Sequence, residues 1–345
     1  MYNQLMKKIR ILLTAIIIYT LSVPLMSCTG GPIAMTPHSR SGIYFDTVIS
    51  ITLYGDGAVA DKRLDEMFKM ADRYENLLSD KKSGSDISKI NTASGKWVKI
   101  HSDTVEAIKQ AYSYSKSSGG VFDLTVGTLS SLWDFKNNTG TIPDKAAIEE
   151  ARKHIDYRNV EIDGNKVRLK DPKARIDLGG IAKGFIADKM KARLEKLGAK
   201  SGIINLGGNV LLIGKRPNNE SYTVGVQKPF SENGEALFTV KAKDISVVTS
   251  GTYQRYFKKN GRIYHHILDI KNGYPYDNGL DSVTIFTKQS TKADALSTTV
   301  FAMGLKKGLE FVNKTEGVEA VFVSTDGKIT KSDNVDRLYD YEKAQ

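Results

Sequence analysis

Residues 174–189 read Ala-Arg-Ile-Asp-Leu-Gly-Gly-Ile-Ala-Lys-Gly-Phe-Ile-Ala-Asp-Lys. The run up to Leu178 predicts a short strand, and the Gly179-Gly180 pair ends it. Apolar residues then recur at the spacing of one helix face, before a glycine that marks a helix end: Ile186, Met190, Leu194, Leu197 and then Gly198. Residues 202–206 predict a second strand, so this unit reads strand, glycine turn, helix, strand.

The glycine turn of this unit has the features of an anion site. Glycines let the backbone approach a ligand closely, and the first turn of a helix presents free N–H groups and a positive dipole end. Lys183 places a cation in that turn, and Asp177 at the strand end can accept from a ligand or from the helix start. The turn matches neither the Walker pattern nor the Rossmann glycine pattern, and an ordinary tight connection explains it equally well.

Charge and length narrow the class of protein. The 345 residues suffice for one large domain or two modest ones, and the formal net charge is +11. Because the basic residues are spread along the chain and are not interleaved with aromatic residues, we expect no nucleic-acid partner.

The amino terminus predicts export and lipidation. Three basic residues precede an apolar core at residues 11–19 that is short for a membrane span. Leu25-Met26-Ser27-Cys28 follows and resembles a bacterial lipobox, in which the cysteine receives the lipid. Cys28 is the only cysteine, so disulfides and cysteine-based metal sites are excluded. We expect a signal peptide at 1–27, a tether at 28–42 and one folded domain at 43–345, on a lipoprotein anchored to a membrane and facing the periplasm.

The rest of the pattern favours an α+β fold with mostly antiparallel sheets and packed helices, since strands and helices do not alternate strictly. Strands are expected at 43–54, 211–214, 223–227, 238–241, 245–249, 263–269, 280–287 and 320–324, with a hairpin over 160–171. Helices are expected at 61–78, 101–116, 145–154, 292–303 and 305–313.

Three further segments carry candidate chemistry, although each also has a purely structural interpretation. The first is Thr249-Ser250-Gly251-Thr252, a turn before aromatic residues. The second is His265-His266, of which only one side chain can face a given site because neighbouring strand residues point to opposite faces. The third lies on a helix, where Asp294, Ser297 and Thr298 share one side and offer the hard oxygen atoms that Mg²⁺ accepts.

Taken in order, these segments resemble the ApbE family of flavin transferases, which move FMN from FAD to a protein threonine. The resemblance covers nearly the whole mature chain, in the family's order: residues 85–91, 119–123, 177–184, 205–209, 249–251, 266–269 with 273–275, and 294–298. It implies two lobes around a central FAD cleft.

The resemblance also implies roles for single residues. His266 would be the catalytic base, and a Mg²⁺ ion would be held by the Gly180 carbonyl, Asp294, Thr298 and Ser297. Contacts with FAD would come from Phe45, Lys81, Val121, Phe122, Asp123, Asp177, Lys183, Ser250, Gly251 and Ile267. The chain departs from the family pattern in three segments: Phe45-Asp46 replaces Met-Gly, Lys81 replaces an aromatic residue, and Thr252 replaces Asp.

The expected reaction is Mg²⁺-dependent transfer of FMN to a threonine of a target protein, with release of AMP. The implied acceptors are subunits of sodium-pumping or Rnf-type respiratory complexes. Two alternatives remain open from the sequence: an FAD pyrophosphatase that gives FMN and AMP, and a lipoprotein that binds FAD without chemistry.

Overall fold

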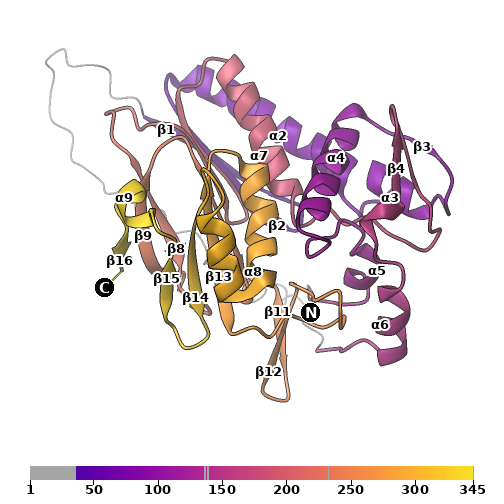
Figure 1. The fold of residues 1–345 in the computed structure, drawn as a ribbon. Helices are drawn as coiled ribbons and strands as arrows, with labels where there is room; N and C mark the ends of the chain where they lie inside the picture. The colour runs from indigo at the N-terminus through magenta and orange to yellow at the C-terminus, as the bar shows by residue number, and fades with distance from the viewer. Residues whose placement is uncertain (1–35, 136, 138–139, 232, 345) are drawn as a thin grey trace, which may run out of the picture.

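An eight-stranded antiparallel sheet forms the body of the protein (Figure 1). The computed structural model describes residues 36–135, 137, 140–231 and 233–344. The order across the sheet is β1-β2-β6-β7-β10-β13-β14-β15. Its strands are β1 (Pro37–Tyr44), β2 (Thr47–Tyr54), β6 (Ser201–Leu206), β7 (Asn209–Gly214), β10 (Ser246–Gly251), β13 (Leu280–Thr287), β14 (Glu319–Ser324) and β15 (Ile329–Lys331).

Three smaller antiparallel sheets accompany it. One is the β11–β12 hairpin, the second has the order β16-β9-β8, and the third has the order β3-β5-β4. Their strands are β3 (Val98–Lys99), β4 (Val160–Asp163), β5 (Lys166–Leu169), β8 (Tyr222–Gln227), β9 (Ala236–Ala242), β11 (Tyr256–Lys259), β12 (Arg262–His265) and β16 (Glu342–Lys343).

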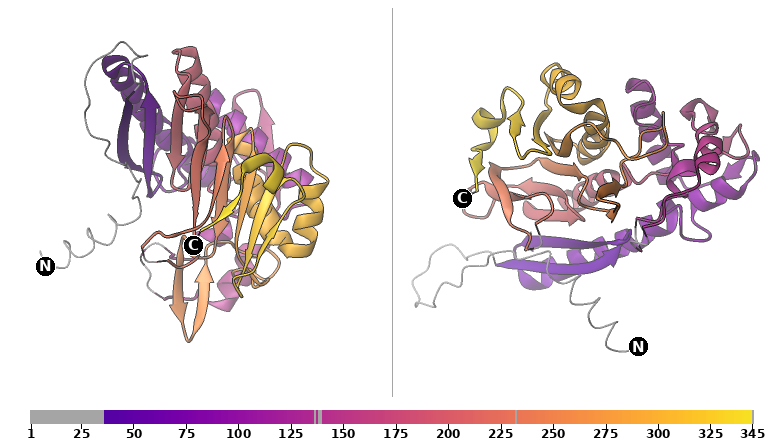
Figure 2. Two further views of the ribbon diagram at one scale, coloured as in Figure 1. Left: turned by 90° about the vertical axis from the view of Figure 1, so that its left-hand side faces the viewer. Right: turned by 90° about the horizontal axis from the view of Figure 1, so that it is seen from below.

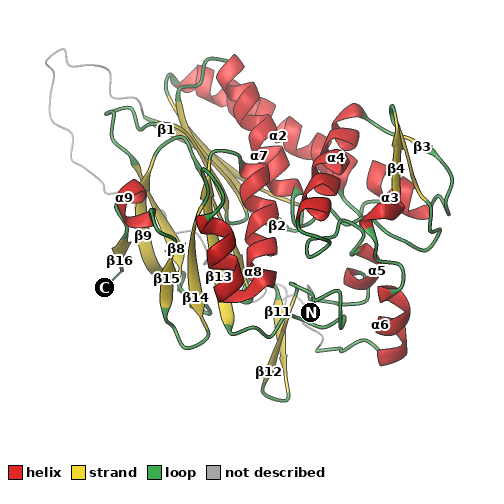
Figure 3. Cartoon of the chain, in the orientation of Figure 1, coloured by secondary structure: helices red, strands yellow, loops and turns green. Residues whose placement is uncertain are grey.

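The helices divide between two parts of the molecule (Figure 3). Helices α2, α7 and α8 pack on the main sheet, while α3 to α6 gather around the β3-β5-β4 sheet and form a second lobe. The helices are α2 (Gly57–Leu78), α3 (Asp86–Thr92), α4 (Ser102–Ser117), α5 (Gly127–Ser130), α6 (Lys145–Arg152), η1 (Tyr157–Asn159), α7 (Ala182–Lys196), α8 (Ser290–Asn313) and α9 (Val335–Tyr339). No helix in the described part of the chain is long and apolar enough to cross a membrane.

Both faces of the main sheet are buried. In β7, Leu211 and Ile213 belong to the core under the helices, while Leu212 between them packs with the β16-β9-β8 sheet. In β13, Ile285 packs in the core beneath α8, and its neighbour Phe286 packs with the β16-β9-β8 sheet. A strand covered on both faces needs apolar residues at consecutive positions, which explains the unbroken apolar runs in these segments.

The structure confirms the α+β class and most of the expected elements, and it corrects the first strand. Residues 43–54 form the end of β1 and all of β2, because the chain reverses at Phe45 and Asp46 with φ of 53° and 57°. This is a two-residue hairpin turn with positive φ at both positions. The expected tether at 28–42 is also too long, since β1 begins at Pro37. The rest of the tether, the signal peptide and Cys28 lie outside the described residues.

Three smaller differences concern the loops. The strand expected up to Leu178 is only an isolated bridge between Val126 and Arg175. Helix α3 and strand β11 were not among the expected elements, and Ser250 and Gly251 of the expected turn belong to strand β10. The break expected between 303 and 305 is confirmed, because Gly304 in α8 has φ of 74° and interrupts the helical backbone.

Helices α7 and α8 are packed unusually closely at their amino-terminal halves. An ideal Cβ built on Gly184 of α7 would lie 2.3 Å from the carbonyl oxygen of Ser290 and 2.8 Å from Cβ of Asp294, both in α8. Asp188 of α7 caps α8 by accepting from the backbone N–H groups of Ser290 and Thr291, each at 2.8 Å. Gly184 therefore permits the close approach of α7 and α8, and the hydrogen bonds of Asp188 hold the two helices in that position.

We predict that Gly184→Ala lowers the free energy of unfolding by about 1–3 kcal/mol, because the added methyl group forces the two helices apart. Gly225→Ala is the matched control, since its Cβ would meet only Cβ of Ala236, at an ordinary 3.5 Å. Chemical denaturation of both variants tests this. Equal stability of Gly184→Ala and the wild type would show that the helices do not need this contact.

Candidate functional site

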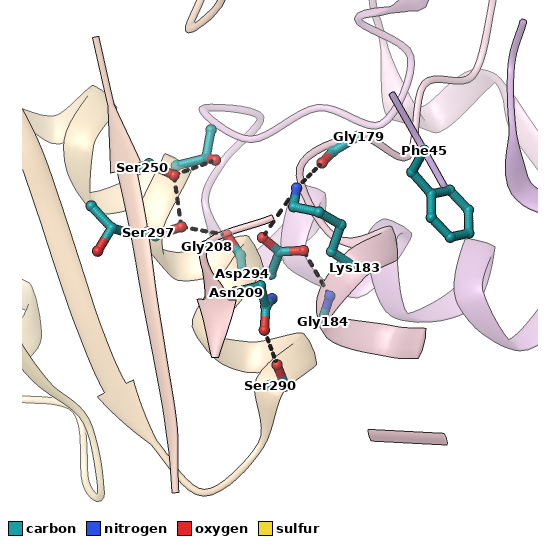
Figure 4. Close-up of polar contacts among 12 residues, drawn as sticks. Phe45, Gly179, Lys183, Gly184, Gly208, Asn209, Ser250, Ser290, Asp294 and Ser297 are labelled. Carbon is teal, nitrogen blue, oxygen red and sulfur yellow. Dashed lines mark hydrogen bonds and ion pairs between the residues drawn. The ribbon is translucent and has the colours of Figure 1, made fainter. Parts of the chain in front are cut away.

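The centre of the candidate site is Asp294, at the place where α8 crosses α7 (Figure 4). Its side chain is almost fully buried. Oδ2 accepts from the backbone N–H of Gly184 at 2.8 Å, and Oδ1 lies 4.0 Å from Nζ of Lys183. Lys183 also donates to the carbonyl of Gly179 at 3.4 Å. One oxygen of the carboxylate is thus committed to the fold, while the other faces a cation and can take a ligand.

Hydroxyl groups line the next turn of α8. Ser297 Oγ donates to the carbonyl of Asp294 at 2.8 Å and lies 2.8 Å from Ser250 Oγ of β10. Ser250 Oγ is also 3.3 Å from Thr298 Oγ1. Ser297 is fully buried, and its hydroxyl already has two hydrogen-bond partners, the carbonyl of Asp294 and the hydroxyl of Ser250. Its main role in this structure is therefore to join α8 to β10.

The glycine turn lies against this hydroxyl cluster. An ideal Cβ on Gly180 would meet the ring of Phe122 at 3.0 Å and Thr298 Oγ1 at 3.7 Å. The structure therefore brings Gly180 next to Thr298 and Asp294 of α8, which lie more than a hundred residues further along the sequence.

These donors fit a magnesium ion. Among the described residues no group of three or more His, Cys, Asp or Glu side chains is placed to hold a metal. A single carboxylate oxygen, a hydroxyl and a backbone carbonyl nevertheless form a hard oxygen set, and Mg²⁺ usually keeps several waters and binds substrate phosphates alongside one or two carboxylates.

Asp177 orients the glycine turn. Its Oδ1 accepts from the N–H of Gly179 at 2.7 Å, and its Oδ2 accepts from Ser130 Oγ at 2.7 Å. Asp80 lies within electrostatic reach: burial, and then the charge of Asp177, raise the pKa of the Asp80 carboxyl, while Lys81 opposes the shift. Lys81 itself is exposed in the loop after α2. The roles of Asp177 and Lys81 toward FAD stay predictions.

The structure separates the two neighbouring histidines. His265 lies within hydrogen-bond distance of Tyr276 O through Nε2, at 2.9 Å, and accepts from the N–H of Ile267 through Nδ1, at 3.3 Å. His265 is therefore bound at both ring nitrogens. His266 Nδ1 is buried without a hydrogen-bond partner among the described residues. Of these two histidines, only His266 has a ring nitrogen without a partner in the described part of the chain.

His266 is held neutral. Burial lowers the pKa of its imidazole to about 3, and the positive charges of Arg255 and Lys183 act in the same direction. Lys183 is thus within electrostatic reach of both His266 and Asp294. A neutral imidazole is the form that a general base requires.

Phe45 and Ile267 are two more of the predicted contacts with FAD. Phe45, at the β1–β2 turn, is half-buried and accepts through its carbonyl from Arg255, at 3.3 Å. Ile267 is buried in the core beneath α8 with Val248 and Leu296, so its side chain supports the histidine loop.

The loop after α4 places Phe122 near the turn. Val121 is half-buried, and the Phe122 ring is the nearest neighbour of Gly180. Asp123 accepts from the backbone N–H groups of Thr125, at 2.8 Å, and Tyr157, at 3.0 Å. Both of its oxygens therefore organise the loop, and burial raises the pKa of this carboxyl.

Gly251 follows Ser250 at the end of β10 and lies under the ring of Tyr253, which an added Cβ would meet at 2.5 Å.

Asn209 was not among the predicted site residues. Its Oδ1 accepts from Ser290 Oγ at 2.6 Å, while its buried Nδ2 has no partner among the described residues. The sequence signal for it was the Asn-Leu-Gly-Gly-Asn run at 205–209.

The sequence matches the ApbE family over residues 45–322. The chain belongs to the ApbE family. It is 34% identical over 299 residues to an FAD:protein FMN transferase of Klebsiella pneumoniae, covering 86% of this chain and 92% of that protein. An FAD:protein FMN transferase of Treponema pallidum is 30% identical over 331 residues, with 90% and 91% covered.

Solved structures of the ApbE family agree with this fold. The ApbE protein of Thermotoga maritima superposes with a TM-score of 0.80 at 31% identity, covering 87% of this chain and 98% of that one. The flavinyl transferase ApbE of Pseudomonas stutzeri, in its apo form, gives 0.77 at 26% identity, with 88% and 97% covered.

The lowered pKa of His266 predicts a pH-dependent stability. The unfolded chain takes up a proton near the ordinary value of 6.5, whereas the folded chain does so only near 3. The free energy of unfolding therefore falls as the pH drops from about 6.5 toward about 3. His266→Gln should lose less stability over this interval than the wild type, measured by denaturation at several pH values.

The matched control is His38→Gln, in the edge strand β1 and outside the site. If the wild type and His266→Gln lose stability in parallel on acidification, the imidazole is not held neutral by its surroundings.

Proposed function

We propose that this chain is an FAD:protein FMN transferase that uses Mg²⁺ and a threonine of a target protein as acceptor. The observation that carries the proposal is that Lys183 lies within electrostatic reach of both His266 and Asp294. His266 is a neutral base with an unpaired ring nitrogen, and Asp294 is a carboxylate with one oxygen not bound to the backbone. Both groups near the same lysine are what phosphoryl transfer to a hydroxyl requires. The names of the relatives and the membership of the ApbE family support the same reaction.

In the proposed reaction the threonine oxygen attacks the phosphorus on the FMN side of the FAD pyrophosphate. A new bond forms between this oxygen and phosphorus, and the bond from phosphorus to the bridging oxygen breaks, so that AMP leaves with that oxygen. The imidazole of His266 accepts the threonine proton through a ring nitrogen. Because little covalent chemistry is asked of the protein, correct positioning accounts for much of the rate.

The remaining residues bind and orient the substrate. Lys183 lies at the first turn of α7, where a cation and helix N–H groups attract phosphate oxygens. Asp294, Thr298 and the Gly180 carbonyl would hold Mg²⁺, which when bound neutralises charge on the pyrophosphate. FAD would lie in the cleft between the lobes, contacted by the predicted residues around the Gly179–Gly180 turn, Phe122 and Ser250.

FAD hydrolysis is the competing reaction at the same residues, with water in place of threonine. A carrier that binds FAD without chemistry is disfavoured by the free base of His266, for which a carrier has no use. Incubation with FAD, Mg²⁺ and a candidate acceptor subunit, followed by in-gel flavin fluorescence and quantification of AMP, distinguishes the three functions. AMP without any labelled acceptor would indicate hydrolysis, and no turnover would indicate a carrier.

We predict that Asp294→Asn loses transfer and binds divalent metal more weakly while it stays folded. Asparagine can still accept from the N–H of Gly184 but removes the charge next to Lys183. Asp294→Ala is a poorer test, since it leaves a buried N–H unpaired at a cost of about 1–3 kcal/mol. The measurements are flavinylation rate and metal affinity, with Asp65→Asn on the exposed face of α2 as control.

His266→Ala provides the contrast. It should slow transfer by about 10²–10⁴-fold, because it removes the base, and it should keep metal-dependent FAD binding. Transfer at the wild-type rate in Asp294→Asn under limiting Mg²⁺ would contradict the proposed metal site.

We also propose that Cys28 carries a lipid and that the enzyme faces the periplasm, as a membrane-anchored lipoprotein. The support is the sequence alone, with a basic start, a short apolar core and a lipobox before Cys28. The enzyme and an acceptor subunit in the same membrane, such as one of a sodium-pumping or Rnf-type complex, would then find each other by diffusion in the plane of that membrane.

Cells that express the protein and are fed labelled palmitate should incorporate label into the wild type and not into Cys28→Ser. Fractionation should move the variant from membranes to the soluble fraction. Label retained in Cys28→Ser would refute the anchor.

A further inference from the structure

The β11–β12 hairpin stands apart from the other sheets. Its strands pair only with each other in the described part of the chain, so each keeps an unpaired outer edge. A turn at Asn260 and Gly261, both with positive φ, closes its tip. Figures 1 and 2 show that the hairpin projects from the lower end of the molecule. A projecting pair of strands with open backbone edges can accept a further strand.

Aromatic packing makes this projection rigid. Phe257 and Tyr264, opposite each other in the hairpin, stack with ring centroids 5.2 Å apart. Trp133 and Phe135 from the loop after α5 stack on them, at 6.0 Å from Trp133 to Tyr264 and 5.9 Å from Phe135 to Phe257. The hairpin is therefore fixed to the second lobe on this face.

The tip of the hairpin is basic. Lys258, Lys259 and Arg262 are exposed. Among the described residues neither lysine has a carboxylate partner, and Lys258 Nζ lies 5.9 Å from the centre of the Phe230 ring. Arg262 is partly neutralised by Asp277, at 3.5 Å. The two lysines therefore present uncompensated charge in a defined position.

The root of the hairpin carries the proposed base. Strand β12 ends at His265, and the N–H of His266 donates to the carbonyl of Arg255 at 3.1 Å. A hollow of about 350 Å³ lies between the tip of β12 and the loop after the histidines. It is lined by Arg262, by the carboxylates Asp269 and Asp277, and by Asn272, Tyr274, Pro275 and Tyr276. A segment that lay along β12 would run from the basic tip toward His266.

We propose that the β11–β12 hairpin is the docking site of the acceptor protein, and that it receives an extended acidic segment next to the target threonine. This inference rests on the proposed function and names the partner of the same site. The lysines attract the acidic side chains, and the free edge of β12 supplies main-chain hydrogen bonds.

Two alternative roles of the lysines are outcomes of the test. Lysines on an edge strand also protect it against aggregation, and a basic tip also binds anionic lipid headgroups. The acceptor is favoured because the hairpin leads directly to His266 and because its aromatic packing fixes the direction of approach.

The experiment measures fluorescence anisotropy of a short dye-labelled peptide with one threonine flanked by aspartates, against the same peptide flanked by lysines. The proteins are the wild type, Lys258→Glu/Lys259→Glu, and the control Lys306→Glu/Lys307→Glu, a consecutive exposed pair in α8 with the same charge change. We expect the acidic peptide to bind the wild type and the control alike, and the hairpin variant at least about tenfold more weakly. The lysine-flanked peptide should not bind.

Equal affinity of the hairpin variant and the wild type, or an equal loss in the control, would overturn the proposal. So would a hairpin variant that keeps peptide binding but loses binding to vesicles containing an anionic phospholipid. Binding is read without transfer, so a failure of the proposed function appears separately, as absence of flavinylated acceptor with the wild type.

Discussion

The arrangement of the site depends on the close crossing of α7 and α8. Two carboxylates hold this crossing, one from each helix, and each accepts from the backbone of the other helix. Asp188 of α7 caps the first turn of α8, and Asp294 of α8 accepts from the backbone of α7 at Gly184. Only a residue without a side chain allows this approach. Because both bonds lie in the amino-terminal halves of the two helices, the crossing also sets the position of Lys183 in the first turn of α7 and of the glycine turn that precedes it.

This crossing explains how one carboxylate can serve both the fold and a ligand. Oδ2 of Asp294 is used by the backbone, so the orientation of Oδ1 toward Lys183 is fixed before any substrate arrives. The serine pair that joins α8 to β10 fixes Thr298 in the same way. Preorganised groups of this kind need no reorganisation during the reaction, which is the main source of electrostatic catalysis.

The sequence predicted those parts of the fold that local periodicity determines. The apolar spacing of α7, the buried run of β13 and the break at Gly304 are all visible in it. The turn at Phe45 and Asp46 was missed because it lacks the glycine or asparagine typical of such turns. The ordered motifs identified most of the site residues. They could not show that His266, and not His265, has an unpaired ring nitrogen, or that Asn209 has an unpaired donor, because these properties depend on partners distant in sequence.

We propose that the α7–α8 crossing builds a metal site from Asp294, Thr298 and the Gly179–Gly180 turn. The most direct measurement is anomalous diffraction from crystals grown with FAD and Mn²⁺. We predict one anomalous peak within coordination distance of Asp294 Oδ1 and Thr298 Oγ1, adjacent to the FAD phosphates. A peak that lies elsewhere, or FAD phosphates bound at the turn without any peak, would contradict it.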